Sequence, residues 1–167
     1  MPVKTNAQLA AFFNTGDQPS ETEFGHLIDT IQPAHVTMAD ANVSLTVADH
    51  AYRLLIWPDM DGGKTITMPT PAADVWFHIV HGIHAAADGV TLTIDAEDKS
   101  FLGQIQSFDT DATSGVSITP VFATTADDGI TIPTSAGFDL WFHGKDTASW
   151  YVWGWALTTG IATATNI

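Results

Sequence analysis

The stretch SWYVWGWA, residues 149–156, carries the alternation that predicts the fold. Successive side chains of an extended strand point to opposite faces, so Trp150 and the valine two residues later share one face. The opposite face carries Tyr151, Trp153 and Trp155. The first row can fill a core. The second row needs another neighbour, which is either a second core layer, the N-terminal segment or another chain, since aromatic residues are enriched at subunit contacts.

An alternation of apolar and polar residues recurs from His35 onward. It covers residues 43–47, 65–68, 90–94 and 138–143. Turn-forming residues separate such segments at Asp61-Gly62-Gly63, Asp88-Gly89, Ser114-Gly115 and Asp128-Gly129. About ten short strands with this spacing predict a mainly β domain over residues 34–167, an antiparallel β-sandwich or small barrel of jelly-roll-like type.

Residues 1–33 predict a pair of short helices ahead of the β-domain. Thr5 with Gln8 has the spacing of a capping box, and so does Ser20 with Glu23. An apolar stripe at positions i, i+3, i+4 and i+7 follows the second cap, formed by Phe24, Leu27, Ile28 and Ile31. Neither helix, at about 10 residues, would be stable alone, so we expect this stripe to dock on protein.

The composition narrows the class of protein. The chain has 167 residues, enough for one domain, and no cysteine, which removes disulfides and thiolate chemistry. Its net charge of −14 repels phosphate backbones and argues against binding to nucleic acid. No apolar run approaches the ~20 residues that cross a bilayer, and no signal peptide is visible. We therefore expect a soluble protein made in the cytoplasm, with no membrane partner.

Three histidines, His78, His81 and His84, are the nearest approach to a metal motif. Zinc takes three or four ligands in a tetrahedron. On a strand His78 and His81 point to opposite faces, and His78 and His84 are roughly 20 Å apart unless the chain turns at Gly82. These histidines are a weak metal candidate, with stacking around a trimer axis as an alternative, and we expect no metal and no cofactor.

Acidic pairs also recur in turns, at Asp59 with Asp61, Asp109 with Asp111, and Asp127 with Asp128. Turn aspartates commonly bond to backbone, and the twelve-residue calcium loop is missing, so solvated turns are expected, with calcium as the alternative. Asp74 and Asp139 are the acids that lie within apolar runs, and both fit strand edges. No nucleophile elbow, phosphate loop or dinucleotide fingerprint occurs, so we expect no enzyme.

Tryptophans on a protein surface offer another kind of site, because a flat aromatic ring can stack on a sugar ring. Trp57, which precedes Pro58 and Asp59, and Trp141, close to His143, are the candidates. The alternative for both tryptophans is a position in the core or at its rim.

The opening segment FNTGDQPSETEFGHLID, residues 13–29, is similar to a helical leader of tailed-bacteriophage virion proteins. The body resembles the head decoration, or cement, proteins of such phages at LTVAD (45–49), GKTITMP (63–69), FLG (101–103) and WYVWG (150–154). The similarity spans nearly the whole chain through short motifs. The leader also precedes tail and fibre proteins.

The resemblance implies a structural virion protein that binds the outside of the capsid and reinforces it. Its implied partners are the major capsid protein and further copies of itself, commonly as a homotrimer at local three-fold positions. We expect the interface in the helix stripe and in the row of Tyr151, Trp153 and Trp155. The alternative is a tail or fibre component that binds host-surface carbohydrate.

Overall fold

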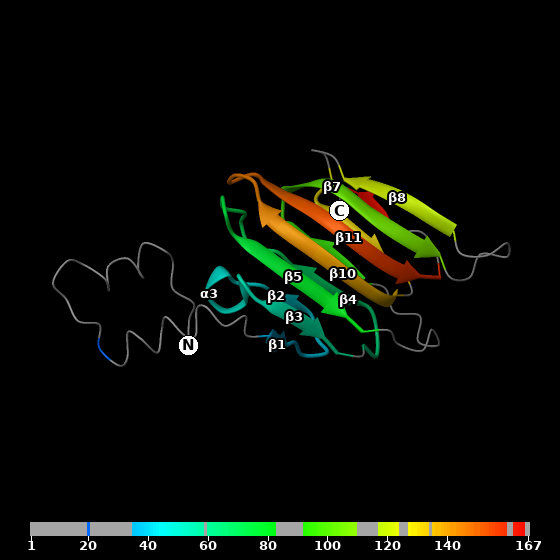
Figure 1. Ribbon diagram of the computed structural model, residues 1–167, viewed down its shortest axis with the longest axis horizontal. Coiled ribbons are helices and arrows are strands. Elements are labelled where there is room, and N and C mark those ends of the chain that lie inside the picture. Colours follow the sequence, from blue (N-terminus) through cyan, green and yellow to red (C-terminus); the bar gives the residue numbers. More distant parts are fainter. Residues whose placement is uncertain are drawn as a thin grey trace.

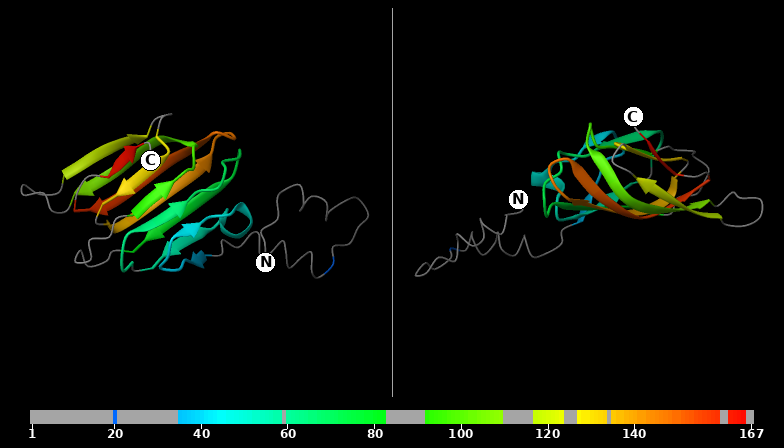
Figure 2. Two further views of the ribbon diagram at one scale, coloured as in Figure 1. Left: turned by 180° about the vertical axis from the view of Figure 1, so that it is seen from behind. Right: turned by 90° about the horizontal axis from the view of Figure 1, so that it is seen from above.

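Two mixed β-sheets lie face to face in the computed structural model (Figures 1 and 2). The structure describes residue 20 and residues 35–58, 60–82, 92–109, 117–123, 127–133, 135–159 and 162–165. The helical pair predicted over residues 1–33 lies outside these ranges, apart from Ser20. Within them the chain is mainly β, which confirms the fold class that the alternation predicted.

The described residues form twelve strands and one short helix. In chain order these are β1 (His35–Thr37), β2 (Val43–Ser44), α3 (Val47–His50), β3 (Leu54–Trp57), β4 (Lys64–Thr67), β5 (Trp76–His81), β6 (Leu92–Asp95), β7 (Ser100–Asp109), β8 (Ser117–Ala123), β9 (Gly129–Ile132), β10 (Ser135–Gly144), β11 (Ser149–Thr158) and β12 (Thr163–Thr165). The seven-stranded sheet has the order β1-β3-β5-β10-β11-β7-β8, and the five-stranded sheet has the order β12-β9-β6-β4-β2.

The prediction of purely antiparallel sheets is wrong. β1, β3 and β5 run parallel in the seven-stranded sheet, and β2, β4 and β6 run parallel in the other. From β1 to β6 the chain alternates between the two sheets. Each of the later strands therefore runs in the same direction as the preceding strand of its own sheet, which lies two strands earlier in the chain. A crossing between layers and a hairpin both use turns rich in Gly and Asp, so the turn residues did not distinguish the two connections.

The core lies between the sheets and takes one row of side chains from each long strand. Phe77 lies opposite Phe142, and Trp150 lies opposite Phe101; none of the four is measurably exposed. The Trp150 indole N–H donates to the carbonyl oxygen of Pro69 at 3.2 Å, so its one polar atom is paired inside the protein. Burial of side chains of this size contributes about 1.5–3 kcal/mol each, and the inward position predicted for Trp150 is confirmed.

The strand expected at residues 43–47 ends early, because a helix cap competes with it. β2 stops at Ser44, and Thr46 then caps α3. The Thr46 hydroxyl accepts a hydrogen bond from the Asp49 backbone N–H at 3.1 Å and donates to the Asp49 carboxylate at 2.8 Å. Such local side-chain bonds satisfy the first turn of a helix and take the backbone out of the strand.

Two glycines in the middle of the seven-stranded sheet have a backbone conformation that other residues rarely adopt. Gly103 in β7 has φ +133°, and Gly154 in β11 has φ +141°. A Cβ atom on Gly103 would collide with the Val152 carbonyl oxygen, and one on Gly154 with the Asp139 carbonyl oxygen. Glycine therefore lets three neighbouring strands approach each other at points where any side chain would separate them.

Candidate functional site

A band of aromatic side chains crosses the outer face of the seven-stranded sheet, which is the face turned away from the second sheet. Its members come from β5, β10 and β11, and they are Trp76, His78, Trp141, His143, Tyr151, Trp153 and Trp155. Along β5 and β10 each member follows or precedes a buried core residue, so the period of two directs it outward. The band lies over strands near the middle of the sheet (Figure 1).

The centre of the band is a stack of rings at directly opposed strand positions. His78 lies opposite Trp141, and Trp141 lies opposite Trp153. The His78 and Trp141 rings stack with centroids 3.9 Å apart, and the two indoles lie 6.2 Å apart with planes 3° from parallel. Trp76 adds a contact with Trp141 at 5.5 Å. Cross-strand pairs of this kind contribute about 0.2–1 kcal/mol each, so the stack fixes the rings before any partner arrives.

One side-chain hydrogen bond fixes the imidazole end of this stack. The His78 Nε2 and Asp139 Oδ1 atoms are 2.8 Å apart, and both side chains are partly buried on the outer face. The carboxylate holds the imidazole plane against Trp141. Asp139 therefore has a partner within the chain, which is a structural role, but it lies in the middle of β10 and not at the strand edge expected for it.

The row of Tyr151, Trp153 and Trp155 is the exposed part of the band. The exposed fractions are 43%, 45% and 37%, respectively. The prediction that these three residues share the face opposite Trp150 is confirmed, but the expectation that they fill a second core layer is wrong, because the row points away from the five-stranded sheet. Contact with the N-terminal segment lies outside the described residues, and an interface with another chain stays a prediction.

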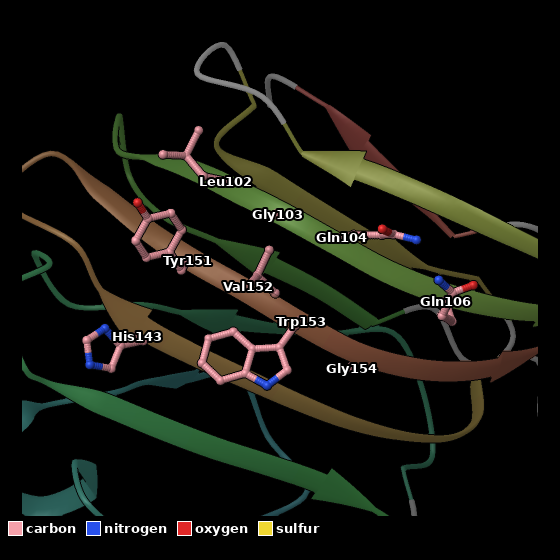
Figure 3. A pocket seen from close by; sticks show the side chains of 9 residues that line it. All are labelled: Leu102, Gly103, Gln104, Gln106, His143, Tyr151, Val152, Trp153 and Gly154. Carbon is pink, nitrogen blue, oxygen red and sulfur yellow. The ribbon is translucent and has the colours of Figure 1, made fainter.

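An open groove of about 620 Å³ lies beside this row, between β11 and β7 (Figure 3). It is lined by Leu102, Gly103, Gln104, Gln106, His143, Tyr151, Val152, Trp153 and Gly154. Gly103 and Gly154 leave the backbone bare there, which opens the space. In Figure 3 the rings of Tyr151 and Trp153 are seen broadside, with the two glutamines along the neighbouring strand.

The two glutamines were not predicted as site residues. Gln104 lies opposite Trp153, and Gln106 lies opposite Trp155, because β7 and β11 pair in parallel. A second, smaller hollow of about 280 Å³ lies further along the same two strands and is lined by Phe108, Trp155 and Leu157. Trp155 thus belongs to this second hollow and is not among the residues that line the groove.

Of the two tryptophans named from the sequence as sugar-stacking candidates, Trp57 lies in the core and Trp141 on the outer face. Trp57 is only 2% exposed and lies in the core, so that candidate is wrong. Its place in β3 next to the buried half of β5 explains the burial, since Trp57 pairs with His81 on the inward side. Trp141 lies on the outer face within the ring stack, and His143 lines the groove.

The side chains of His78 and His81 lie on opposite faces of β5. His78 belongs to the outer face, whereas His81 is buried at 5% exposure with its Nδ1 3.4 Å from the Trp57 carbonyl oxygen. This confirms that the two point to opposite faces. His84 lies outside the described residues. In the part of the chain that the structure describes, no three His, Asp or Glu side chains gather as a metal site would require.

Of the predicted acidic pairs, Asp127 and Asp128 lie within the described residues, where their backbone carbonyl oxygens accept from Phe101 and Ala96, and the turn at Asp61 holds a lysine. Asp59 and Asp111 lie outside the described residues. The Lys64 ammonium bonds to Asp61 at 2.8 Å and to Asp40 at 3.1 Å. The hydrogen bond between Lys64 and Asp61 lowers the pKa of Asp61 and raises the pKa of Lys64. A lysine already bridges these two carboxylates, so the turn fits a structural role better than a calcium site.

Two further pKa shifts occur at one end of the outer face. Burial raises the pKa of Tyr52, with a smaller contribution from the Asp74 carboxylate, and the phenol packs edge-on against Trp76 at 5.9 Å. The backbone N–H of Ala148 donates to Asp146 at 2.7 Å and lowers the pKa of that carboxyl. The ionised Asp146 side chain thereby holds the turn that joins β10 and β11.

Comparison of the chain with protein-family models, with curated proteins and with solved structures finds no match. Among the described residues, none of the helical structure has the length and apolar character needed to cross a bilayer. The chemistry of the outer face and its groove is therefore the basis on which a function can be inferred.

Proposed function

We propose that this chain is a structural virion protein that attaches to the outside of a phage capsid and reinforces it by binding, without catalysis. The observation that carries the binding, non-catalytic part of this proposal is the exposed aromatic row of Tyr151, Trp153 and Trp155. Contiguous exposed apolar surface of this kind marks interaction sites on otherwise soluble proteins. The row therefore supports a protein whose work is to bind.

The chemistry of the groove also favours binding over catalysis. Its lining contains a single imidazole, His143, and no carboxylate that could orient or share a proton with it. A carboxylate is the usual group that orients a catalytic imidazole and stabilises its charged form. Asp139, an acid on the same outer face but outside the groove lining, forms a hydrogen bond with His78.

The two parts of the chain have separate tasks on this proposal. The leader-like residues 1–33, with their apolar stripe, attach the chain to the major capsid protein and join copies into a homotrimer. The β-domain then sits on the capsid surface with its aromatic face accessible. The net charge of −14 favours solubility until a capsid lattice is present.

Deleting residues 1–33 is expected to abolish binding to capsids or trimer formation, because the helix stripe is then lost. Purified protein is mixed with capsids that lack it, co-sedimented, and sized by light scattering. Leu27→Asp introduces a charge into the stripe and should reproduce the loss in the full chain, whereas Thr30→Asp, off the stripe, should not. A truncated protein that still trimerises and still decorates capsids contradicts the proposal.

The position of the protein on the particle separates the proposal from its alternative. Cryo-electron microscopy of virions should show density for the β-domain over the capsid shell. Density on the tail or fibres would instead support the tail component that binds host-surface carbohydrate.

A further inference from the structure

We infer that the groove between β7 and β11 is a binding site for a neutral oligosaccharide, with Trp153 as its stacking platform. This goes beyond attachment to a capsid and does not depend on where the particle carries the chain. The groove combines the open ring of Trp153, hydrogen-bonding groups beside that ring, a lining without Asp, Glu, Lys or Arg, and a shape held by strand pairing.

Trp153 offers an indole face that the protein itself does not cover. Its ring is nearly parallel to that of Trp141, but the centroids are 6.2 Å apart, compared with 3.9 Å for the stack of His78 on Trp141. With 45% of its surface exposed, Trp153 keeps room for another flat partner. A pyranose ring has one face of C–H groups, which complements the negative face of an aromatic ring.

Groups that recognise hydroxyls stand next to that ring. Gln104 lies directly opposite Trp153 on the neighbouring strand, and Gln106 follows two residues later on the same face. Each amide carries two donors and one acceptor oxygen, so it can both donate to and accept from sugar hydroxyls. His143 and the Tyr151 hydroxyl add polar groups at the other end of the groove (Figure 3). An apolar ring face edged by amides fits a sugar better than it fits a lipid chain.

The charge of the groove points to a neutral ligand. None of its nine lining residues is Asp, Glu, Lys or Arg. A sulfated or sialylated glycan would find no cation there and would approach a chain with a net charge of −14. A basic protein would find no carboxylate within the groove. A second copy of this chain would bring the same negative charge, so charge opposes that occupant as well.

The size and rigidity of the groove complete the case. Its volume of about 620 Å³ lies within the roughly 300–1,000 Å³ of typical small-molecule sites. The bare backbone at Gly103 and Gly154 forms part of its lining, and strand pairing on both sides holds the walls. A preformed site loses little entropy when a ligand binds.

The test uses the full chain with maltohexaose, cellohexaose, mannohexaose and galactohexaose as neutral probes and a heparin hexasaccharide as the anionic one. Binding is followed by isothermal titration and by tryptophan fluorescence. We expect at least one neutral probe to bind and the heparin fragment not to bind. Trp153→Ala should weaken that binding at least about tenfold, a loss of about 1.4 kcal/mol, and Gln104→Ala should weaken it several-fold.

Trp155→Ala is the matched control, since Trp155 lies on the same strand and is similarly exposed but lines the second hollow. It should change the affinity less than about twofold, which corresponds to roughly 0.4 kcal/mol. The inference is overturned if no neutral probe binds at millimolar concentration, if the heparin fragment binds best, or if Trp153→Ala and Trp155→Ala weaken the affinity for the neutral probe equally. It is also overturned if Trp153→Ala converts a trimer or dimer to monomer, because the face then holds a second copy.

Capsid co-sedimentation of the same variants keeps this inference separate from the proposed function. Trp153→Ala should still bind capsids through residues 1–33. Loss of sugar binding with capsid binding intact supports the groove, and loss of capsid binding as well assigns the outer face to the capsid and overturns the sugar site.

Discussion

Trp150→Ala is expected to lower the free energy of unfolding by about 3–5 kcal/mol, because the substitution empties a large volume of core. The side chain has no measurable exposure and packs against Phe77 with ring centroids 5.5 Å apart. The change also removes the donor to the Pro69 carbonyl oxygen. Domains of ordinary stability unfold with about 5–15 kcal/mol, so urea denaturation should show a large fall in the midpoint.

Trp153→Ala provides the matched comparison three residues along the same strand. Its side chain is 45% exposed on the outer face, so its loss should change the stability by less than about 1 kcal/mol. If the two variants were equally destabilised, the assignment of the two rows of β11 would be contradicted. A folded Trp153→Ala protein also makes its binding measurements interpretable, since any loss of affinity then reflects the site.

Gly154→Ala is expected to cost about 2–4 kcal/mol, which combines the strain of a positive φ with overpacking between strands. The new methyl group would meet the Asp139 carbonyl oxygen, which belongs to rigid backbone in β10. The strands must therefore move apart, and the damage should extend to the ring stack across β10 and β11. Thermal unfolding and near-ultraviolet circular dichroism, which reports on packed tryptophans, measure both effects.

Gly62→Ala is the control for that experiment. A Cβ atom there would meet nothing within 4 Å, so the change in stability should stay within about 0.5 kcal/mol. A Gly154→Ala protein as stable as Gly62→Ala would show that β10 and β11 can separate without loss, contrary to the tight approach seen at Gly154.

The facing of side chains could be predicted because it depends only on local geometry. Along β11 the period of two puts Trp150 on one face and Tyr151 and Trp153 on the other without any knowledge of neighbours, although it does not tell which second layer, if any, covers the latter face. Strand direction could not be predicted, because the same turn residues serve a hairpin within one sheet and a crossing between two. Trp57 shows the same limit: with Pro58 and Asp59 after it, it was a candidate for an exposed sugar-stacking ring, but the parallel pairing of β3 with β5 puts it inside.

The groove was beyond sequence reasoning for a related reason. The aromatic row was visible as a local pattern, but Gln104 and Trp153 meet only through the register of two parallel strands that are far apart in the sequence. Gly103, which also lines the groove, carried no signal of this role in the sequence. A helix-capping pattern at Thr46 and Asp49 was present in the sequence and would have shortened the expected strand at residues 43–47.

The strand order of the seven-stranded sheet also sets when the groove can exist. β5 and β7 are not neighbours, because β10 and β11 lie between them. During synthesis the ribosome releases both outer strands of this quartet before either inner one, and pairings so distant in sequence form slowly. Tyr151 and Trp153 belong to β11, which lies between β10 and β7 in the sheet. Gln104 belongs to β7, which is synthesised earlier and pairs with β11 only after β11 has been made. An unfinished chain therefore lacks the groove between β7 and β11.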